Sequence, residues 1–215
     1  MSIHSVMRAS STARRLSVVR QSPASGDKRD LILKAATKVF AQNGYFNSQV
    51  ADVARVAGVA AGTVYLYFKS KDDLLVSIFE QSMQRALAEV RAAIDGVDDP
   101  AERLQTIARL HLERLGRDKD LAVVFQVELR QSVKFMERFS ESFLQDYFTL
   151  IRQAIADGQQ HGVFRKGISA TTATKIFFGA LDEMATNWVL SRRKHDLRAE
   201  ADAVVDLFIN GVKRP

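Results

Sequence analysis

The fold is decided by residues 44–74, which read GYFNSQVADVARVAGVAAGTVYLYFKSKDDL. Apolar residues recur at helical spacing on both sides of Ala57-Gly58, which predicts two short helices joined by a tight turn. Gly58 suits this turn because a residue without a Cβ adopts positive φ at no steric cost. Asn47 or Ser48 can cap the first of these helices, since either side-chain oxygen can accept a hydrogen bond from a first-turn N–H.

A further helix precedes this stretch, beginning near Lys28 and ending at Gly44. Its apolar residues lie on one helical face and are Leu31, Ile32, Ala35, Ala36, Val39 and Phe40. Three helices in this order, with the turn between the second and the third, predict a helix-turn-helix domain over residues 27–72. Residues 1–26 show no sustained periodicity, so we expect a flexible basic arm.

The remaining residues, 73–215, predict a larger helical domain for ligand binding and dimerisation. Asp99 and Pro100 fit the cap and the first position of one of its helices. No segment shows sustained strand alternation, so the expected fold class is all-α, a three-helix domain followed by a helical bundle. We expect the helices of the bundle near 72–94, 101–116, 119–131, 134–159, 170–192 and 197–211.

Composition narrows the function. The chain has 215 residues and no Cys, which excludes disulfides and thiolate metal sites. We therefore expect a soluble cytoplasmic protein with no membrane association, no metal and no cofactor. Residues 28–71 hold seven Lys and Arg against two Asp, whereas residues 72–215 hold twenty basic against twenty-two acidic residues. Positive charge concentrated near the N-terminus favours a polyanionic partner for that domain.

The combination of Gly44-Tyr45, Val53-Ala54, Ala57-Gly58-Val59 and Gly62 to Leu74 closely resembles the DNA-binding domain of the TetR family of bacterial repressors. The resemblance implies that Val59–Tyr65 is the recognition helix, that the partner is operator DNA, and that the chain acts as a homodimer. The residues expected to contact DNA are Gln49, Ala60, Ala61, Gly62, Thr63, Tyr65, Tyr67, Lys69 and Lys71.

The chemistry of these residues divides their roles. The Tyr65 and Tyr67 hydroxyls can bond phosphate oxygens, and Lys69 and Lys71 can neutralise phosphates. Aromatic packing is the alternative; we expect Phe68 in the core and Tyr65 at the DNA, and leave Tyr67 open. Ala60 and Ala61 cannot hydrogen-bond a base, so base recognition would depend on Gln49, Thr63, alanine contacts with thymine methyl groups or DNA shape.

A second resemblance lies in the larger domain. QVELRQS at 126–132, IFFGALDE at 176–183 and TNWV at 186–189 resemble the TetR-type regulators of fatty acid degradation, called FadR. The resemblance implies a repressor of fatty acid metabolism genes that leaves DNA when it binds long-chain acyl-CoA. The residues expected to bind this effector are Arg109, Phe125, Gln126, Leu129, Arg130, Gln131, Phe148, Phe178, Asp182 and Trp188.

An acyl chain needs an apolar cavity, whereas the CoA phosphates need cations at its mouth. Arg130 is the first candidate for such a cation, because it follows an apolar run and adjoins Gln131. A salt bridge of Arg130 with Glu128, or with an acid on a neighbouring helix, is the alternative. The last two long helices, near 170–192 and 197–211, mix small and large apolar residues, which favours a four-helix dimer interface.

Three other functions remain possible at this point. A multidrug-sensing TetR-type repressor of an efflux pump would have the same fold and a different ligand. A helical scaffold that binds no DNA would leave the basic segment unexplained. An enzyme is disfavoured, because the four histidines have no paired metal spacing and the chain has neither a phosphate-binding glycine loop nor a Gly-x-Ser-x-Gly motif.

Overall fold

The computed structural model describes residues 23–131, 135, 137, 143–192 and 195–212, and every regular element among them is helical. This confirms the all-α fold class. The helix α1 spans Pro23–Asn43, so it begins before Lys28, where the apolar pattern starts. Most of the arm predicted for residues 1–26 lies outside the described residues.

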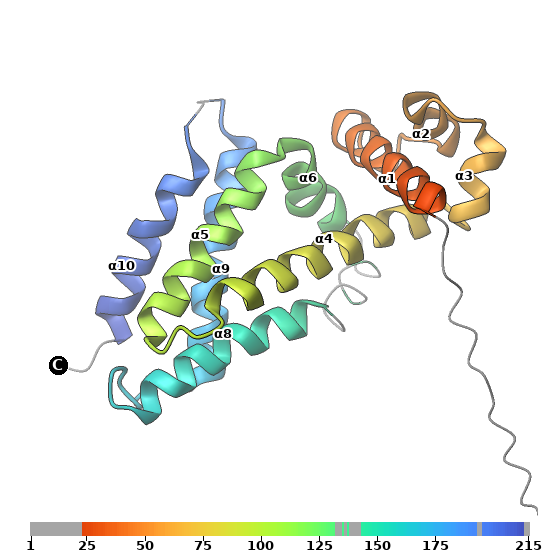
Figure 1. Cartoon of the computed structure of the whole chain (residues 1–215). Helices are drawn as coiled ribbons and strands as arrows, with labels where there is room; N and C mark the ends of the chain where they lie inside the picture. The colour runs from red at the N-terminus through yellow and green to blue at the C-terminus, as the bar shows by residue number, and fades with distance from the viewer. Residues whose placement is uncertain (1–22, 132–134, 136, 138–142, 193–194, 213–215) are drawn as a thin grey trace, which may run out of the picture.

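The first three helices form a compact unit at one end of the molecule (Figure 1). Helix α1 packs against α2 (Val50–Ala57), which is followed by α3 (Ala61–Tyr67). The axes of α2 and α3 differ in direction by 102°, within the range typical of helix-turn-helix pairs. Their shared core, which fixes the outward face of α3, consists of Ile32, Ala36, Phe40, Val53, Ala54, Val64 and Phe68.

Helix α4 (Lys71–Ile94) joins this unit to the larger domain (Figure 1). Its apolar side continues from the helix-turn-helix core into the bundle through Leu74, Leu75, Ile78 and Phe79, all buried. A rigid helix that belongs to both cores can carry a displacement from one domain to the other. The bundle comprises α4, α5 (Pro100–Arg117), α6 (Lys119–Val123), α8 (Phe143–Gln160), α9 (Ala170–Leu190) and α10 (Glu200–Val212), with the short turn η3 (Leu197–Ala199) before α10.

Local sequence accounts for several helix ends. The Ser70 hydroxyl accepts a hydrogen bond from Asp73 N at 3.1 Å and so begins α4. Asp99 Oδ1 accepts from Ala101 N at 2.8 Å ahead of Pro100, which confirms the predicted start of α5. No single described helix is long and apolar enough to cross a membrane, although α2 and α3 meet that test of length and composition when taken together across the sharp bend between them.

The segment 119–131 differs from the single helix predicted there. The α-helix ends at Val123 and continues as a π-helical turn, η1 (Val124–Glu128), and then a 3₁₀ turn, η2 (Leu129–Gln131). Side-chain contacts with both domains, described below, accompany this change of winding. The predicted helix over 134–159 falls partly outside the described residues, and α8 covers its second part.

Candidate functional site

The exposed face of α3 is the first candidate site. Val64 and Phe68 are buried one turn apart, and they direct the opposite side of the helix to solvent. Tyr65 and Leu66 are 57% and 83% exposed, while Tyr67 is only half-buried. Phe68 is therefore a core residue, as predicted, whereas Tyr65 lies at the surface and its contact with DNA stays a prediction. The other exposed residues of this face are Ala60, Ala61 and Gly62, with Thr63 half-buried at its edge.

The turn before α3 shifts the recognition helix, predicted at Val59–Tyr65, two residues towards the C-terminus. Gly58 has φ of 67°, which confirms its predicted role in the turn. Val59 N donates to Ala54 O at 3.0 Å, and Ala60 is extended, so the helix begins only at Ala61 and ends at Tyr67. The exposed Gln49 is the residue before α2, and its backbone N–H donates to Asp52 Oδ2 at 3.1 Å.

Asn47 and Ser48, the predicted caps of α2, have other roles. The Ser48 hydroxyl donates to Gly44 O at 2.7 Å, and the Asn47 amide donates to Asn43 O at 3.2 Å. Both bonds close the turn between α1 and α2. The cap prediction was wrong because the helix starts at Val50, one residue later than Ser48 could serve.

Lys71 does not fit the phosphate contact predicted for it. Its ammonium group donates to Tyr45 O, Phe46 O and Ser48 O at 2.8, 3.3 and 3.0 Å. An ammonium group has three donors, so these carbonyls occupy all of them. Lys71 also lies 4.5 Å from the centre of the Tyr45 ring. It positions the turn at the start of α2, whereas Lys69 is exposed and free to meet a phosphate.

Tyr45 anchors the same turn from its other side. Its hydroxyl donates to Asp72 at the start of α4, and its ring is buried against Phe40 with the ring centres 5.3 Å apart. Burial, with the hydrogen bond to Asp72, raises the pKa of the Tyr45 hydroxyl far above its usual range. The turn is thus held by α4 through both Lys71 and Asp72.

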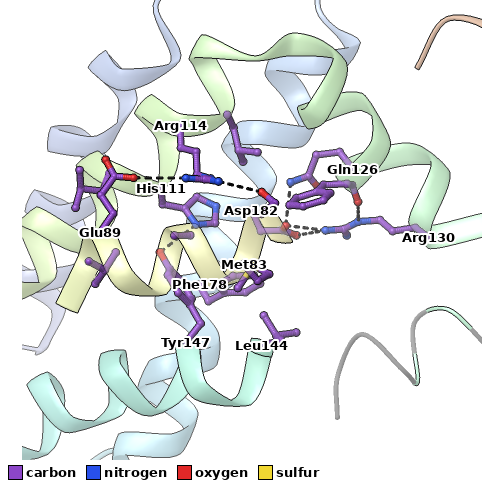
Figure 2. Close-up of a pocket in the computed structure, with 16 residues that line it drawn as sticks. Met83, Glu89, His111, Arg114, Gln126, Arg130, Leu144, Tyr147, Phe178 and Asp182 are labelled. Carbon is purple, nitrogen blue, oxygen red and sulfur yellow. Dashed lines mark hydrogen bonds and ion pairs between the residues drawn. The ribbon is translucent and has the colours of Figure 1, made fainter. Parts of the chain in front are cut away.

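The second candidate site is a cavity of about 60 Å³ inside the bundle (Figure 2). Helices α4, α5, α8 and α9 line it, together with η1 and η2. Half of the lining is apolar and comprises Met83, Ala86, Val90, Leu110, Leu115, Phe125, Leu144 and Phe178. The other half is polar and comprises Ser82, Glu89, His111, Arg114, Gln126, Arg130, Tyr147 and Asp182.

His111 and Tyr147 meet in the wall of this cavity. His111 Nδ1 lies 3.2 Å from the Tyr147 hydroxyl, and the Phe178 ring packs edge-on against the imidazole at 5.7 Å. Burial lowers the pKa of His111 from 6.5 to about 4, although the nearby Asp182 carboxylate opposes this shift. The imidazole is therefore neutral at pH 7, and its Nε2 is buried with no hydrogen-bond partner among the described residues.

A cation lies one turn further along α5. Arg114 donates to Glu89 at 3.5 Å and to the Ser82 hydroxyl at 3.3 Å, both on α4. Burial lowers the pKa of Arg114, and the Glu89 carboxylate partly offsets this effect. These bonds tie the cavity wall on α5 to the helix that carries the DNA-binding domain.

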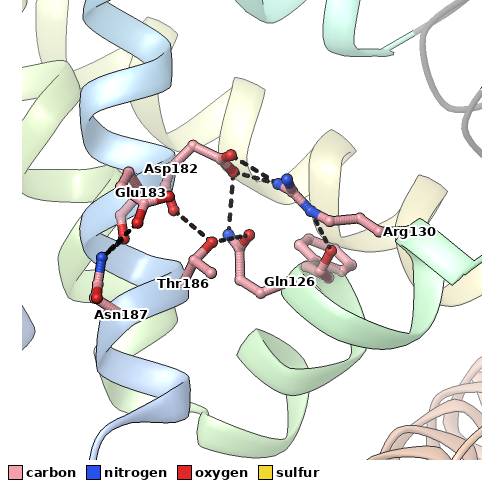
Figure 3. Close-up of polar contacts among 7 residues, drawn as sticks. Gln126, Arg130, Asp182, Glu183, Thr186 and Asn187 are labelled. Atoms are coloured by element: carbon pink, nitrogen blue, oxygen red, sulfur yellow. Dashed lines mark hydrogen bonds and ion pairs between the residues drawn. The ribbon is translucent and has the colours of Figure 1, made fainter.

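Arg130 and Asp182 form the polar edge of the cavity (Figure 3). Arg130 Nη2 lies 2.6 and 2.7 Å from the two Asp182 oxygens. The Gln126 amide also donates to Asp182 Oδ1 at 3.2 Å, and the Thr186 hydroxyl donates to Gln126 Oε1 at 3.0 Å. Arg130 therefore forms a salt bridge with an acid on a neighbouring helix, Asp182, and not with Glu128.

The predicted effector residues divide into two groups. Phe125, Gln126, Arg130, Phe178 and Asp182 line the cavity. The others do not: Arg109 pairs with Asp202 of α10 at 2.9 Å, and the Trp188 indole donates to His195 O at 2.9 Å, while Phe148, Leu129 and Gln131 also lie outside the lining. These five residues do not line the cavity, and their part in effector binding stays a prediction.

Comparison with known proteins places this geometry in a family. Residues 32–78 match the model of the bacterial regulatory proteins of the tetR family. Residues 79–211 match the model of the YsiA-like protein C-terminal region, which belongs to the TetR class of C-terminal domains. The chain belongs to the TetR family. As in this family, the helix-turn-helix of this TetR regulator stands at the N-terminus and its helical bundle follows.

This TetR protein is similar to regulators of fatty acid metabolism, two of which have known structures. It is 36% identical over 181 residues to the fatty acid metabolism regulator protein of Bacillus subtilis (strain 168), covering 84% of this chain and 93% of that one. The structure of FadR from B. subtilis in complex with stearoyl-CoA is 35% identical, with a TM-score of 0.81 over 85% of this chain and 98% of that chain. FadR from Bacillus halodurans is 36% identical, with a TM-score of 0.80 over 86% and 99% of the two chains.

Two polar residues of the cavity were missed in this TetR chain although a signal existed. His111 and Arg114 continue the apolar stripe of α5 that runs through Leu104, Ile107 and Ala108. Polar side chains on the buried face of a helix are candidates for a pocket wall. Burying them carries a desolvation cost, and a functional role is one reason for a protein to bear it.

Proposed function

We propose that this chain is a dimeric transcriptional repressor that leaves its operator when long-chain acyl-CoA binds in the bundle cavity. The observation that carries the proposal is a cavity with both apolar and charged lining residues, in a chain similar over more than four fifths of its length to regulators of fatty acid metabolism. One of these relatives was solved with stearoyl-CoA. The names of these relatives favour this effector over the drug-sensing alternative.

The lining suits such a ligand. Met83, Val90, Leu144 and Phe178 offer apolar contact to an acyl chain, and Arg130, 42% exposed at the edge, offers a cation to a CoA phosphate. The cavity volume of about 60 Å³ is well below the ~300–1,000 Å³ of ordinary ligand sites. Binding therefore requires the surrounding helices to move apart.

That movement would reach the DNA-binding domain through α4. Ser82, Met83 and Glu89 of α4 line the cavity, while Lys71 at its start holds the turn before α2. Displacing α4 in both protomers changes the separation of the two α3 helices, which must match half-sites ~34–36 Å apart or a multiple of this. A coupling of ~1–3 kcal/mol suffices for a ~5–150-fold change in operator affinity.

The DNA contacts belong to the same proposal. The exposed residues from Ala60 to Gly62, with Thr63 and Tyr65, would face the major groove, and Gln49 of the α2 start would lie beside them. Tyr67 and Lys69 would meet phosphates. Lys71 is not included, because its donors are occupied within the domain.

Helices α9 and α10 would form the dimer interface. Ile176 and Leu190 on α9 are 53% and 69% exposed, and Leu207 on α10 is 75% exposed. Large apolar side chains gathered on two helices favour burial against a second copy. Phe208 of the same helix packs inward on Phe177, with the ring centres 4.9 Å apart, and is not part of this face.

A titration tests the proposal. An operator is first selected from a pool of random duplexes with the purified protein, and its affinity is then measured by fluorescence anisotropy with increasing stearoyl-CoA. We expect the affinity to fall at least ~5-fold, the lower end of usual allosteric coupling, while free CoA and stearate have little effect. An unchanged affinity removes the effector, and no preference for any duplex over competitor DNA at low salt removes the repressor.

A further inference from the structure

The segment Val124–Gln131 lies between the cavity and the helix-turn-helix. It begins where α6 gives way to the π turn η1, in which Leu129 N donates to Val124 O, and it ends with the 3₁₀ turn η2. π turns are rare and are frequently found at functional sites. The two turns wind differently from the α-helix before them, so their side chains reach both domains.

One side of this segment faces the cavity. Phe125 lies against Phe79 of α4 with the ring centres 5.5 Å apart, while Gln126 and Arg130 hold Asp182 of α9. Figure 3 shows both side chains converging on the Asp182 carboxylate from the same segment. A ligand phosphate that takes Arg130, or an acyl chain that displaces Phe125, must therefore act on this segment.

The other side of the segment holds the DNA-binding domain. Glu128 is 6% exposed, and its Oε2 accepts from Tyr45 N at 2.6 Å and from the Gln131 amide at 3.2 Å. Tyr45 N belongs to the turn between α1 and α2, 83 residues away in sequence. A backbone N–H of that turn donates to the Glu128 carboxylate, and backbone carbonyls of the same turn accept from the Lys71 ammonium group.

We propose that Glu128 is the positioning residue that transmits effector binding to the helix-turn-helix. The inference rests on the proposed function, since it concerns the response to acyl-CoA. When the ligand separates Arg130 and Gln126 from Asp182, the turns η1 and η2 rotate, and the Glu128 carboxylate leaves Tyr45 N. The turn before α2 is then held only by α4, through Lys71 and Asp72, so it follows α4.

The route is short and its bonds are strong enough to matter. Glu128 lies within four residues of both Phe125 and Arg130, so no rotation of the cavity side leaves it in place. A hydrogen bond from a backbone N–H to a carboxylate is stronger than one between neutral groups, and a buried N–H that loses it has no water to replace it. The bond between Tyr45 N and Glu128 is therefore either made or lost, and its two states correspond to two arrangements of the helix-turn-helix relative to the bundle.

Two substitutions at one position test the inference in the full-length protein. Glu128→Ala removes the acceptor, and Glu128→Gln keeps a weaker, neutral one. The ratio of operator affinities without and with saturating stearoyl-CoA should fall from the ~5–150-fold typical of allosteric coupling to below ~2-fold in Glu128→Ala, with Glu128→Gln between them. Stearoyl-CoA binding, measured by calorimetry, should stay within ~3-fold of wild type, a change smaller than that coupling.

A matched control and a second readout separate transmission from simple structural support. Asp157→Asn removes another carboxylate bond between elements, the 2.6 Å contact with Arg103, far from the helix-turn-helix, and should keep the full ratio. Hydrogen exchange at residues 44–48 should speed up when stearoyl-CoA is added to wild type, and should be fast without ligand in Glu128→Ala.

The outcomes distinguish this inference from the proposed function. If wild-type protein binds no stearoyl-CoA, the effector assignment fails and the inference with it. If wild type responds and both Glu128 variants keep the full ratio, Glu128 does not transmit the signal and the proposed function stands. Unchanged exchange at residues 44–48 on adding stearoyl-CoA to wild type also overturns the inference.

Discussion

Arg130 and Asp182 join η2 to α9 at the edge of the cavity, with one guanidinium nitrogen within 2.7 Å of both carboxylate oxygens. The Arg130 side chain is 42% exposed and that of Asp182 18% exposed. A pair so near to solvent is worth only ~0–1 kcal/mol, since water and salt weaken it. A multiply charged phosphate can therefore compete with Asp182 for the guanidinium.

Replacing Arg130 should weaken the effector response and leave operator binding intact. In Arg130→Ala the affinity for stearoyl-CoA should fall ~10-fold or more, the usual effect of losing a hydrogen bond to a charged group. Calorimetry at two salt concentrations measures it, and the salt dependence should decrease with the affinity. The affinity of the ligand-free protein for its operator should not change, because Gln126 still bonds Asp182 and keeps the segment in place.

Asp182→Asn is the informative partner of this variant. It releases the Arg130 guanidinium and removes a negative charge from the edge of the cavity, so stearoyl-CoA should bind as tightly as to wild type or more tightly. Equal losses in the two variants would mean that the ion pair shapes the cavity and that Arg130 contacts no phosphate.

Lys69 and Lys71, two residues apart, should respond differently to substitution. Lys69 is exposed, so Lys69→Ala should reduce the slope of log affinity against log salt by about 2, the effect of one lost phosphate contact in each protomer of the dimer. Its free energy of unfolding should stay within ~0.5 kcal/mol of wild type. Anisotropy titrations at several salt concentrations, together with urea unfolding, make the comparison.

Lys71→Met should show the reverse. The loss of three hydrogen bonds to backbone carbonyls should lower the free energy of unfolding by about 1–3 kcal/mol. The salt slope should change less than in Lys69→Ala. A loss of slope equal to that of Lys69→Ala in Lys71→Met, with unfolding unchanged, would restore the phosphate contact that the sequence suggested.

A charge at Leu207 should separate the proposed dimer. Leu207 is 75% exposed on α10, and Leu207→Glu would place a carboxylate in an apolar interface. Light scattering after size-exclusion chromatography should show the monomer mass, and operator affinity should fall ~100-fold or more as the advantage of two linked half-sites is lost. Val163→Glu, at a 39% exposed position after α8, is the control and should stay dimeric.

What the sequence predicted well is encoded over short distances. The cap and proline at Asp99 and Pro100, the turn at Gly58 and the inward direction of Phe68 each depend on neighbours within one helical turn. The family resemblance added the order of the two domains. These features were correct because local backbone preferences and packing favour the same structure there.

What it missed depends on partners far along the chain. Segment 119–131 has a continuous helical pattern, and nothing local shows that Gln126 bonds a residue 56 positions away or that Glu128 bonds one 83 positions away. Lys71 was assigned to DNA by its charge. The backbone carbonyls that accept its hydrogen bonds could not be recognised from the sequence. Arg109 and Trp188 were assigned to the pocket by residue type, but their helical faces turn elsewhere.

His111 should make the stability of the protein depend on pH. Its pKa is about 4 in the folded protein and 6.5 as the ordinary value, so the unfolded chain binds the proton more readily between these limits. The stability that the neutral imidazole contributes is thus complete above pH 6.5 and is lost as the pH falls towards 4. At pH 5 the loss should be about 2 kcal/mol relative to pH 7.5.

Urea unfolding of wild type and His111→Phe at both pH values measures this loss. The variant cannot take up this proton, so its loss should be smaller by about that amount. Equal losses in the two proteins would show that the imidazole is already accessible to protons in the folded cavity.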